Sequence, residues 1–104
     1  MYNLKTWAGR SSFKYTGSVR DGTEIIYGSG FRVKLSTQNY INLIPHFSKN
    51  TVDIGTSHDA APKDSLGEWL QKNVTKTAIA SYVGPILIRE GYAEKVGRSQ
   101  IKFK

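Results

Sequence analysis

The first half of the chain alternates apolar and polar residues with the period of β-strands. Phe13, Tyr15 and Val19 are spaced for one face of a strand, with an irregularity at Gly17. The pair Asp21-Gly22 is a strong signal for a hairpin turn, and the apolar residues that follow it predict a return strand. After a glycine-rich bend, residues 31–35 alternate apolar with basic side chains, as expected of a strand with one face in the core.

A short helix and a further strand complete this half. Ser36 or Thr37 can cap a helix, and Pro45 is expected to end it because proline removes a helical donor. Residues 51–54 have strand character, and residues 55–64 have the composition of an exposed loop.

The second half has helical periodicity instead. Ser65-Leu-Gly-Glu68 matches a capping box, which predicts the start of a helix. Thr75 can cap a second helix, whose apolar residues recur at steps of three and four from Ile79 onward. We expect Gly84-Pro85 to interrupt this helix and Gly91 to end it.

Residues 92–103 then predict a terminal β-hairpin. The chain as a whole predicts one α+β domain over residues 1–104. Residues 1–54 would be mainly strands with one short helix, forming an N-terminal antiparallel sheet of three to four strands. After the loop at 55–64, residues 65–104 would form a C-terminal helix pair followed by a β-hairpin.

Composition agrees with one folded domain. A length of 104 residues and a hydrophobic fraction of 38% suit one modest core. The absence of cysteine excludes disulfides and thiolate metal sites. No stretch approaches the roughly 20 apolar residues of a membrane span, and no signal peptide is visible, so we expect a cytoplasmic protein with no membrane partner.

The net charge of +7 is unevenly distributed. Residues 1–50 and residues 71–104 each hold seven basic and two acidic residues, whereas residues 51–70 hold one basic and four acidic residues. Two basic segments therefore flank an acidic middle. A basic surface attracts polyanions, above all nucleic acid, through counterion release, although it can also serve only to keep a protein in solution.

The order of elements over residues 65–104 resembles a winged helix-turn-helix. The matching segments are Leu66–Leu70, Val74–Ile79 at the turn, Leu87–Tyr92 and the basic hairpin Glu94–Phe103. In that family the second helix enters the major groove of DNA with its N-terminal residues, and the wing contacts the backbone or the minor groove. The resemblance implies that Lys76, Thr77 and Ser81 face DNA, because Ile79 and Val83 must face the core.

The wing would add further contacts. Arg98 at its tip and Lys102 on its return strand would meet phosphates. The candidate nucleic-acid-binding residues are Lys76, Thr77, Ser81, Lys95, Arg98, Lys102, Arg32 and Lys34. We expect the basic members of this set to form one stripe if the interpretation is right.

Three classes of function compete. The leading hypothesis is a non-catalytic nucleic-acid-binding module for duplex DNA, without cofactor or metal. The alternative is a protein-interaction or structural domain in which the helices and hairpin only cover the N-terminal sheet. A weaker alternative is a small metal-independent nuclease or toxin that uses His46 or His58, whose spacing matches no metal-binding signature.

Trp7 admits two interpretations. With Tyr2, Lys5 and Arg10 nearby, it could form an aromatic and basic surface for nucleic acid. It could instead anchor the N-terminal segment onto the sheet, and we prefer this second interpretation.

Overall fold

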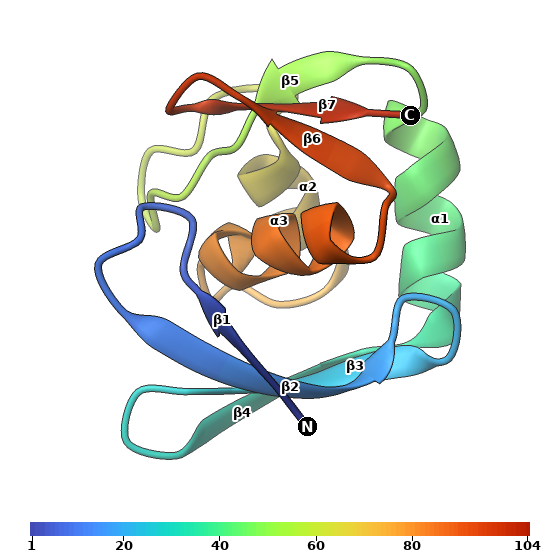
Figure 1. Cartoon of the computed structure of the whole chain (residues 1–104). Coiled ribbons are helices and arrows are strands. Elements are labelled where there is room, and N and C mark those ends of the chain that lie inside the picture. Colours follow the sequence, from blue (N-terminus) through green and yellow to red (C-terminus); the bar gives the residue numbers. More distant parts are fainter.

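Two antiparallel sheets enclose a central helix (Figure 1). The computed structural model describes all 104 residues. The first sheet has the order β1-β2-β3-β4, with strands β1 (Tyr2–Lys5), β2 (Ser12–Ser18), β3 (Gly22–Tyr27) and β4 (Phe31–Leu35). The second has the order β5-β7-β6, with strands β5 (Thr51–Asp53), β6 (Ala93–Val96) and β7 (Gln100–Phe103). The helices are α1 (Thr37–Phe47), α2 (Leu66–Asn73) and α3 (Ala80–Arg89). The α+β class, the N-terminal sheet and the C-terminal hairpin are confirmed.

The N-terminal sheet contains one strand that the pattern did not predict. β1 is short and pairs with β2 along its length, with Tyr2 opposite Tyr15 and Lys5 opposite Ser12. The irregularity at Gly17 is a backbone with φ of +85°, and a Cβ atom there would collide with the Gly22 carbonyl. Glycine at position 17 therefore allows β2 to approach the hairpin turn closely.

The helix α1 begins as predicted and continues further than predicted. The Ser36 side chain accepts a hydrogen bond from the Asn39 amide at 3.0 Å, which caps the helix. Pro45 does not end it, because the helix runs through Pro45 to Phe47. A proline at this position deprives only the carbonyl of Ile41 of a helical donor, and Ile41 is exposed, so water can satisfy that carbonyl.

The cap of α2 is confirmed, with a difference in its second half. Ser65 Oγ accepts a hydrogen bond from the Glu68 amide at 3.1 Å. The Glu68 carboxylate accepts from the amide of Asp64 at 3.0 Å, one residue before the amide that a capping box uses. This hydrogen bond is the main reason why the pKa of Glu68 lies below its ordinary value.

The start of α3 was predicted wrongly. The helix begins at Ala80 after a turn and has no side-chain cap, so Thr75 does not cap it. Gly84 and Pro85 lie within a continuous helix and do not interrupt it. The end at Gly91 is confirmed: the amides of Gly91 and Tyr92 donate to the carbonyls of Ile88 and Leu87, which is a Schellman motif with φ of +86° at Gly91.

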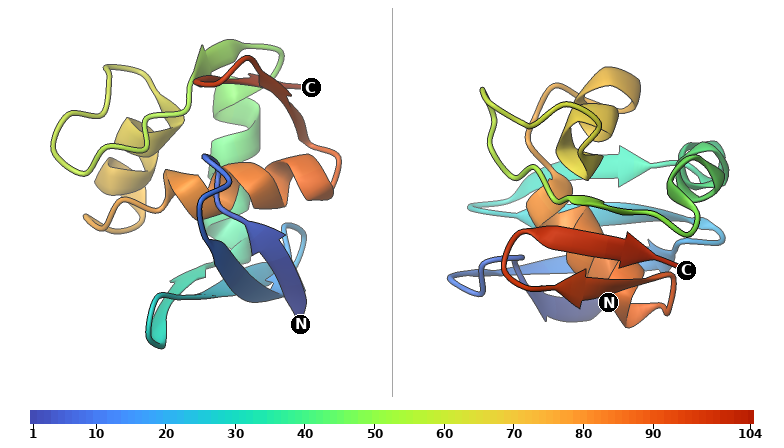
Figure 2. Two further views of the ribbon diagram at one scale, coloured as in Figure 1. Left: turned by 60° about the vertical axis from the view of Figure 1, so that its left-hand side comes forward. Right: turned by 90° about the horizontal axis from the view of Figure 1, so that it is seen from above.

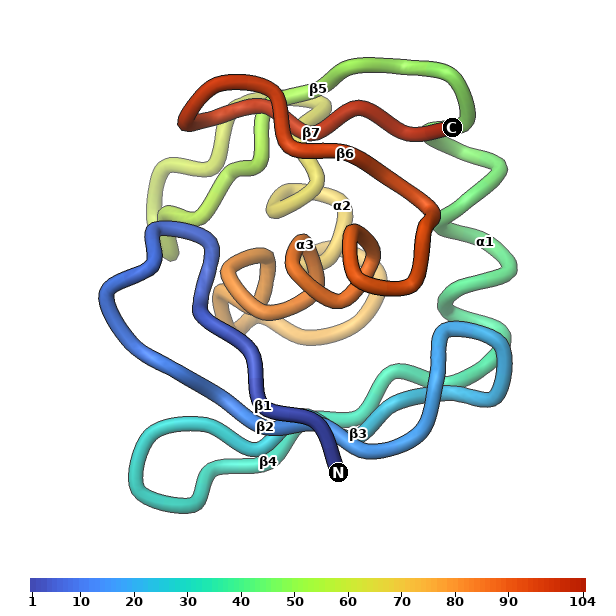
Figure 3. The backbone as a smooth tube through the Cα atoms, in the orientation of Figure 1, coloured from blue at the N-terminus to red at the C-terminus, as the bar shows by residue number.

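One core joins both halves of the chain. Twenty buried apolar residues form a single cluster that includes Tyr15 and Ile25 from the N-terminal sheet and Ile86 and Ile101 from the second half. Residues 55–64 form no helix or strand, as expected. The two chain ends lie at different sheets, the N-terminus beside β1 and the C-terminus after β7 (Figure 3). None of the helices is long and apolar enough to cross a membrane.

Candidate functional site

The helix α3 presents few of its side chains to solvent. Ile79 and Val83 are buried and Lys76 and Thr77 are exposed, as predicted, but both exposed residues precede the helix. Within α3, Arg89 is the only exposed residue, and Ser81 is half-buried. The helix lies between the two sheets (Figures 1 and 2). The expectation that Lys76 and Thr77 lie on the second helix is therefore corrected: both belong to the turn before it, and only Ser81 lies within α3.

The other predicted site residues do not form one stripe. Arg32 and Lys34 lie on the outer face of β4, where Glu24 accepts from Arg32 at 3.0 Å and pairs with Lys34 at 3.8 Å. Lys102 is exposed on β7, opposite Glu94 of β6. Lys95 and Arg98, in contrast, lie at the hairpin end that meets the β1–β2 loop. The structure thus places Arg32 and Lys34 around Glu24 and places Lys95 and Arg98 beside Trp7, as two separate pairs.

Trp7 is what joins the β1–β2 loop to the rest of the molecule. Its side chain is only 5% exposed. Its backbone amide donates to the Ser81 carbonyl of α3 at 2.9 Å, and its indole Nε1 donates to the Arg98 carbonyl in the β6–β7 turn at 2.7 Å. Lys95 Nζ donates to the Trp7 carbonyl at 2.8 Å and lies 4.6 Å from the ring centre. Trp7 is an anchor, but it holds the β1–β2 loop to α3 and to the hairpin and not, as preferred, to the N-terminal sheet.

Gly84 and Pro85 explain how α3 receives this anchor. A Cβ atom on Gly84 would lie 2.8 Å from Trp7 Cε3, so only glycine lets the indole pack against the helix backbone here. Proline has no amide hydrogen, so Pro85 leaves the carbonyl four residues earlier without its helical donor. That carbonyl belongs to Ser81, and the Trp7 amide occupies it. The Gly-Pro pair is therefore a docking position for the β1–β2 loop.

An open hollow of about 380 Å³ lies beside this anchor. Its apolar surface comes from Leu4, Trp7, Pro85 and Ile88. Three cations, one each from β1, the end of α3 and β6, also line it. The complete lining of this Trp7 hollow is Leu4, Lys5, Thr6, Trp7, Gly9, Pro85, Ile88, Arg89 and Lys95. Figure 2 (left) shows the β1–β2 loop lying against α3 at this place.

The cations of the Trp7 hollow are not neutralised by carboxylates. Lys5, Arg89 and Lys95 are exposed, none of them forms an ion pair, and no acidic residue lines the hollow. Arg89 lies 3.7 Å above the ring of Tyr2 and donates one hydrogen bond to the Tyr15 hydroxyl at 3.2 Å, which leaves most of its guanidinium donors free. The hollow therefore presents unpaired positive charge over an apolar surface, an arrangement suited to an amphipathic anion.

A hydrogen-bond network fixes the end of α3 that carries Arg89. The Tyr15 hydroxyl donates to Glu90 at 2.7 Å, and the other carboxylate oxygen of Glu90 accepts from the Val19 amide at 2.8 Å. Burial, reinforced by the hydrogen bond to the Glu90 carboxylate, raises the pKa of Tyr15 to about 12. Because Glu90 is engaged with the N-terminal sheet, it does not pair with its neighbour Arg89.

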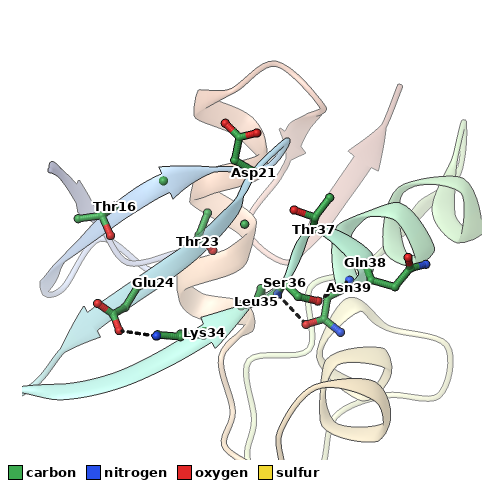
Figure 4. A pocket seen from close by; sticks show the side chains of 12 residues that line it. Thr16, Asp21, Thr23, Glu24, Lys34, Leu35, Ser36, Thr37, Gln38 and Asn39 are labelled. Atoms are coloured by element: carbon green, nitrogen blue, oxygen red, sulfur yellow. Dashed lines mark hydrogen bonds and ion pairs between the residues drawn. The ribbon is translucent and has the colours of Figure 1, made fainter.

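A larger hollow, of about 740 Å³, lies where β3 and β4 meet the start of α1 (Figure 4). Its lining contains Asp21, Glu24 and Lys34 among mostly polar residues. Lys34 pairs with Glu24 at 3.8 Å, and the Ser36 amide donates to the Asn39 side chain at 2.9 Å. Charges of both signs and internal pairing give this hollow no preference for an anion.

The histidines do not form a catalytic arrangement. His58 is exposed in the 55–64 loop, and its ring makes one hydrogen bond or ion pair, with the adjacent Asp59 carboxylate at 2.8 Å. His46 packs its ring against Phe47 and Trp69 at the end of α1. No group of three or more metal-ligating side chains comes together anywhere in the chain.

Two residues of the Trp7 hollow escaped the sequence interpretation as site residues. Lys5 is near Trp7 in the sequence, but the preferred anchor role for Trp7 assigns no contact to Lys5. Arg89 lies more than 80 residues away, and its position depends on how α3 packs against β1. The signal that could have found the site is the Gly84-Pro85 pair, since a helix that tolerates both residues needs an external partner.

Comparison of the chain with protein-family models, curated proteins and solved structures finds no match. Function is therefore inferred from the residues of this chain alone.

Proposed function

We propose that this chain is a non-catalytic nucleic-acid-binding domain that contacts phosphates around the Trp7 hollow. The observation that carries the proposal is the convergence of Lys5, Arg89 and Lys95, from three separate segments, on one hollow without a carboxylate. Phosphate contacts by such cations release condensed counterions and supply most of the affinity of sequence-independent binding. The net charge of +7 adds a long-range attraction of the same sign.

The order of elements lends the winged helix-turn-helix resemblance partial support. A helix-turn-helix usually has a further helix ahead of the pair, and α1 precedes β5, α2 and α3. The wing strands β6 and β7 follow α3. Because the N-terminal sheet packs against α3, however, the proposed contact is with the nucleic-acid backbone and uses the wing and the β1–β2 loop. Insertion of α3 into a groove is not part of the proposal.

A binding titration at several salt concentrations tests this function. The unaltered protein is expected to bind generic DNA or RNA oligonucleotides with an affinity that falls steeply as salt rises. Lys5→Ala should weaken binding and lower the salt slope by about one unit, because it removes one phosphate contact. The Lys5 side chain makes no hydrogen bond or ion pair within the protein, so this change should leave stability unaffected.

Two matched variants separate a site from diffuse attraction. Arg20→Ala removes one exposed cation at the β2–β3 turn, and Lys76→Ala removes one before α3. Both should leave the salt slope nearly unchanged. If Lys5→Ala, Arg20→Ala and Lys76→Ala weaken binding equally, the binding is due to the overall positive charge and not to a site. If only Lys76→Ala weakens binding, the result favours the recognition-helix hypothesis. A protein without salt-sensitive binding to any nucleic acid contradicts the proposed function.

A protein-interaction role is the second candidate, and an apolar hollow on α1 favours it. This hollow of about 410 Å³ is lined by Tyr40, Ile41, Ile44 and Tyr92 among others, and Ile41 is 54% exposed. Exposed apolar surface of this kind often marks a contact between proteins. If the surface pairs two copies of the chain, sedimentation should reveal a concentration-dependent dimer that Ile41→Glu abolishes.

A further inference from the structure

The shape and chemistry of the Trp7 hollow point beyond phosphate contact to a preference for single strands. We infer that the hollow takes one unpaired nucleotide of a single-stranded nucleic acid, with its base against the apolar surface and its phosphate at the cations. This inference rests on the proposed function, because it names the form of nucleic acid that the same site selects.

The apolar surface is the first step. A site that only gathers phosphates needs cations on an open surface and has no use for an apolar hollow between them. Leu4, Pro85 and Ile88 are apolar and line the hollow without being fully buried, so they remain accessible to a ligand. The volume of about 380 Å³ lies at the lower end of the roughly 300–1,000 Å³ typical of small-molecule pockets. A single base with part of its sugar suits such a space better than a stacked pair of bases.

The cations are the second step. Arg89 Cζ lies 3.7 Å from the centre of the Tyr2 ring, and Arg89 lines the hollow. Arginine planes stack on unpaired bases, and their remaining donors bind phosphate. Lys95 is held by the Trp7 carbonyl at 2.8 Å and keeps two further ammonium donors. Arg89 and Lys95 are thus positioned before a ligand arrives.

Access is the third step. In a duplex the bases are stacked and paired, and bringing one into a protein pocket requires unstacking it at a cost of a few kcal/mol. A single strand presents its bases without that cost. A duplex can therefore offer phosphates to Lys5, Arg89 and Lys95, but it leaves the apolar surface unfilled. The difference should appear as tighter binding of the single strand.

Oligonucleotides that differ only in their bases test this inference on the unaltered protein. Fluorescence anisotropy would compare a labelled thymine single strand, an abasic strand of the same length and a duplex of the same length. The thymine strand is expected to bind about fivefold or more tightly than the abasic strand, the factor that one well-placed base contributes. Equal affinities for the thymine and abasic strands, or a preference for the duplex, overturn the inference while leaving the proposed function in place.

A fluorescent reporter inside the protein locates the base. The chain has two tryptophans, so Trp69→Phe leaves Trp7 as the only indole. Emission of Trp7 should change on addition of the thymine strand and much less on addition of the abasic strand, because Trp7 is one of the residues that line the hollow. Unchanged Trp7 emission at saturation would place the base elsewhere and overturn the inference. Absence of salt-sensitive binding by all three oligonucleotides would instead remove the proposed function itself.

Discussion

Gly84 is the residue on which the packing of the β1–β2 loop depends most directly. In an exposed helix, replacing glycine by alanine stabilises the helix by up to about 1 kcal/mol. At position 84 the added Cβ atom would lie 2.8 Å from Trp7 Cε3 and 2.9 Å from Ile54 Cδ1. We therefore expect Gly84→Ala to lower the free energy of unfolding by roughly 1–3 kcal/mol, as overpacked core substitutions do. Denaturant unfolding measures this.

A double variant identifies the cause of that loss. If the clash is with the indole, Gly84→Ala should cost less in a Trp7→Leu background than in the unaltered protein. Additive losses, or a stabilising effect of Gly84→Ala alone, would contradict the packing described here.

Ser65 carries a second residue-scale prediction. Its side chain is fully buried and accepts the Glu68 amide at 3.1 Å, so Ser65→Ala should lower the free energy of unfolding by about 1 kcal/mol. Thr75→Ala is the matched control, because Thr75 caps no helix and its hydroxyl makes only a 3.4 Å contact with the Thr77 amide. Thermal unfolding that gives equal losses for both variants would argue against the cap.

Residue-scale features were predictable where their cause is local. The caps at Ser36 and Ser65 and the terminator at Gly91 depend on neighbours within five residues, and all were anticipated. Pro85 was misjudged because its effect depends on Trp7, which lies almost 80 residues away in the sequence. The carbonyl of Ser81, which lacks a helical donor because of Pro85, instead accepts a hydrogen bond from the distant Trp7 amide, so the proline causes no loss of hydrogen bonding.

At the scale of elements, the contact between α3 and the N-terminal sheet should give stability a distinctive pH dependence. The folded protein holds the proton of Tyr15 to a pKa of about 12, whereas an unfolded tyrosine loses it near pH 10. Between these values the unfolded state binds fewer protons, so the free energy of unfolding falls as pH rises from about 10 to 12. Below pH 10 the contribution of Tyr15 is fully present.

Tyr15→Phe isolates this contribution. At neutral pH the variant should be less stable by roughly 1–2 kcal/mol, because Glu90 loses its hydroxyl donor. The deficit should shrink as pH rises through the window from about 10 to 12, since ionisation of Tyr15 in the unfolded state lowers the stability of the unaltered protein there and cannot occur in the variant. Denaturant unfolding across that range measures both curves. Parallel curves would mean that Tyr15 does not titrate as its burial requires.

The elements themselves were mostly predictable, and their packing was not. Strands β2, β3 and β4 follow from alternation and the Asp21-Gly22 turn, which are local signals. β1 was missed because four residues with one partner strand carry too little pattern to stand out. The extent to which α3 is buried was not predicted because Ser81 and Arg89 look like the polar side of a surface helix. Tyr82 stacks with Tyr27 of the sheet at 4.8 Å.

In the whole molecule, folding brings basic residues from distant segments together. The net charges of the three sequence segments do not show which of these residues meet. The two basic segments meet where the β1–β2 loop contacts α3 and the hairpin, and the cations of Arg32 and Lys34 are partly neutralised by Glu24. The predicted set of site residues and the lining of the Trp7 hollow therefore share only Lys95. Which cations converge is decided by long-range packing, on which a single sequence carries little information.

Amide chemical shifts of the labelled protein, followed during titration with a thymine single strand at low salt, would show directly whether the Trp7 hollow binds nucleic acid. We expect the largest changes on Lys5, Gly9, Arg89 and Lys95 and on the Trp7 indole, and we expect the changes to diminish as salt is added. Arg20, Arg32 and Lys34 should shift little, since they lie away from the Trp7 hollow. Changes centred on Lys76 and Thr77, changes spread evenly over all exposed cations, or no changes at all would contradict this expectation.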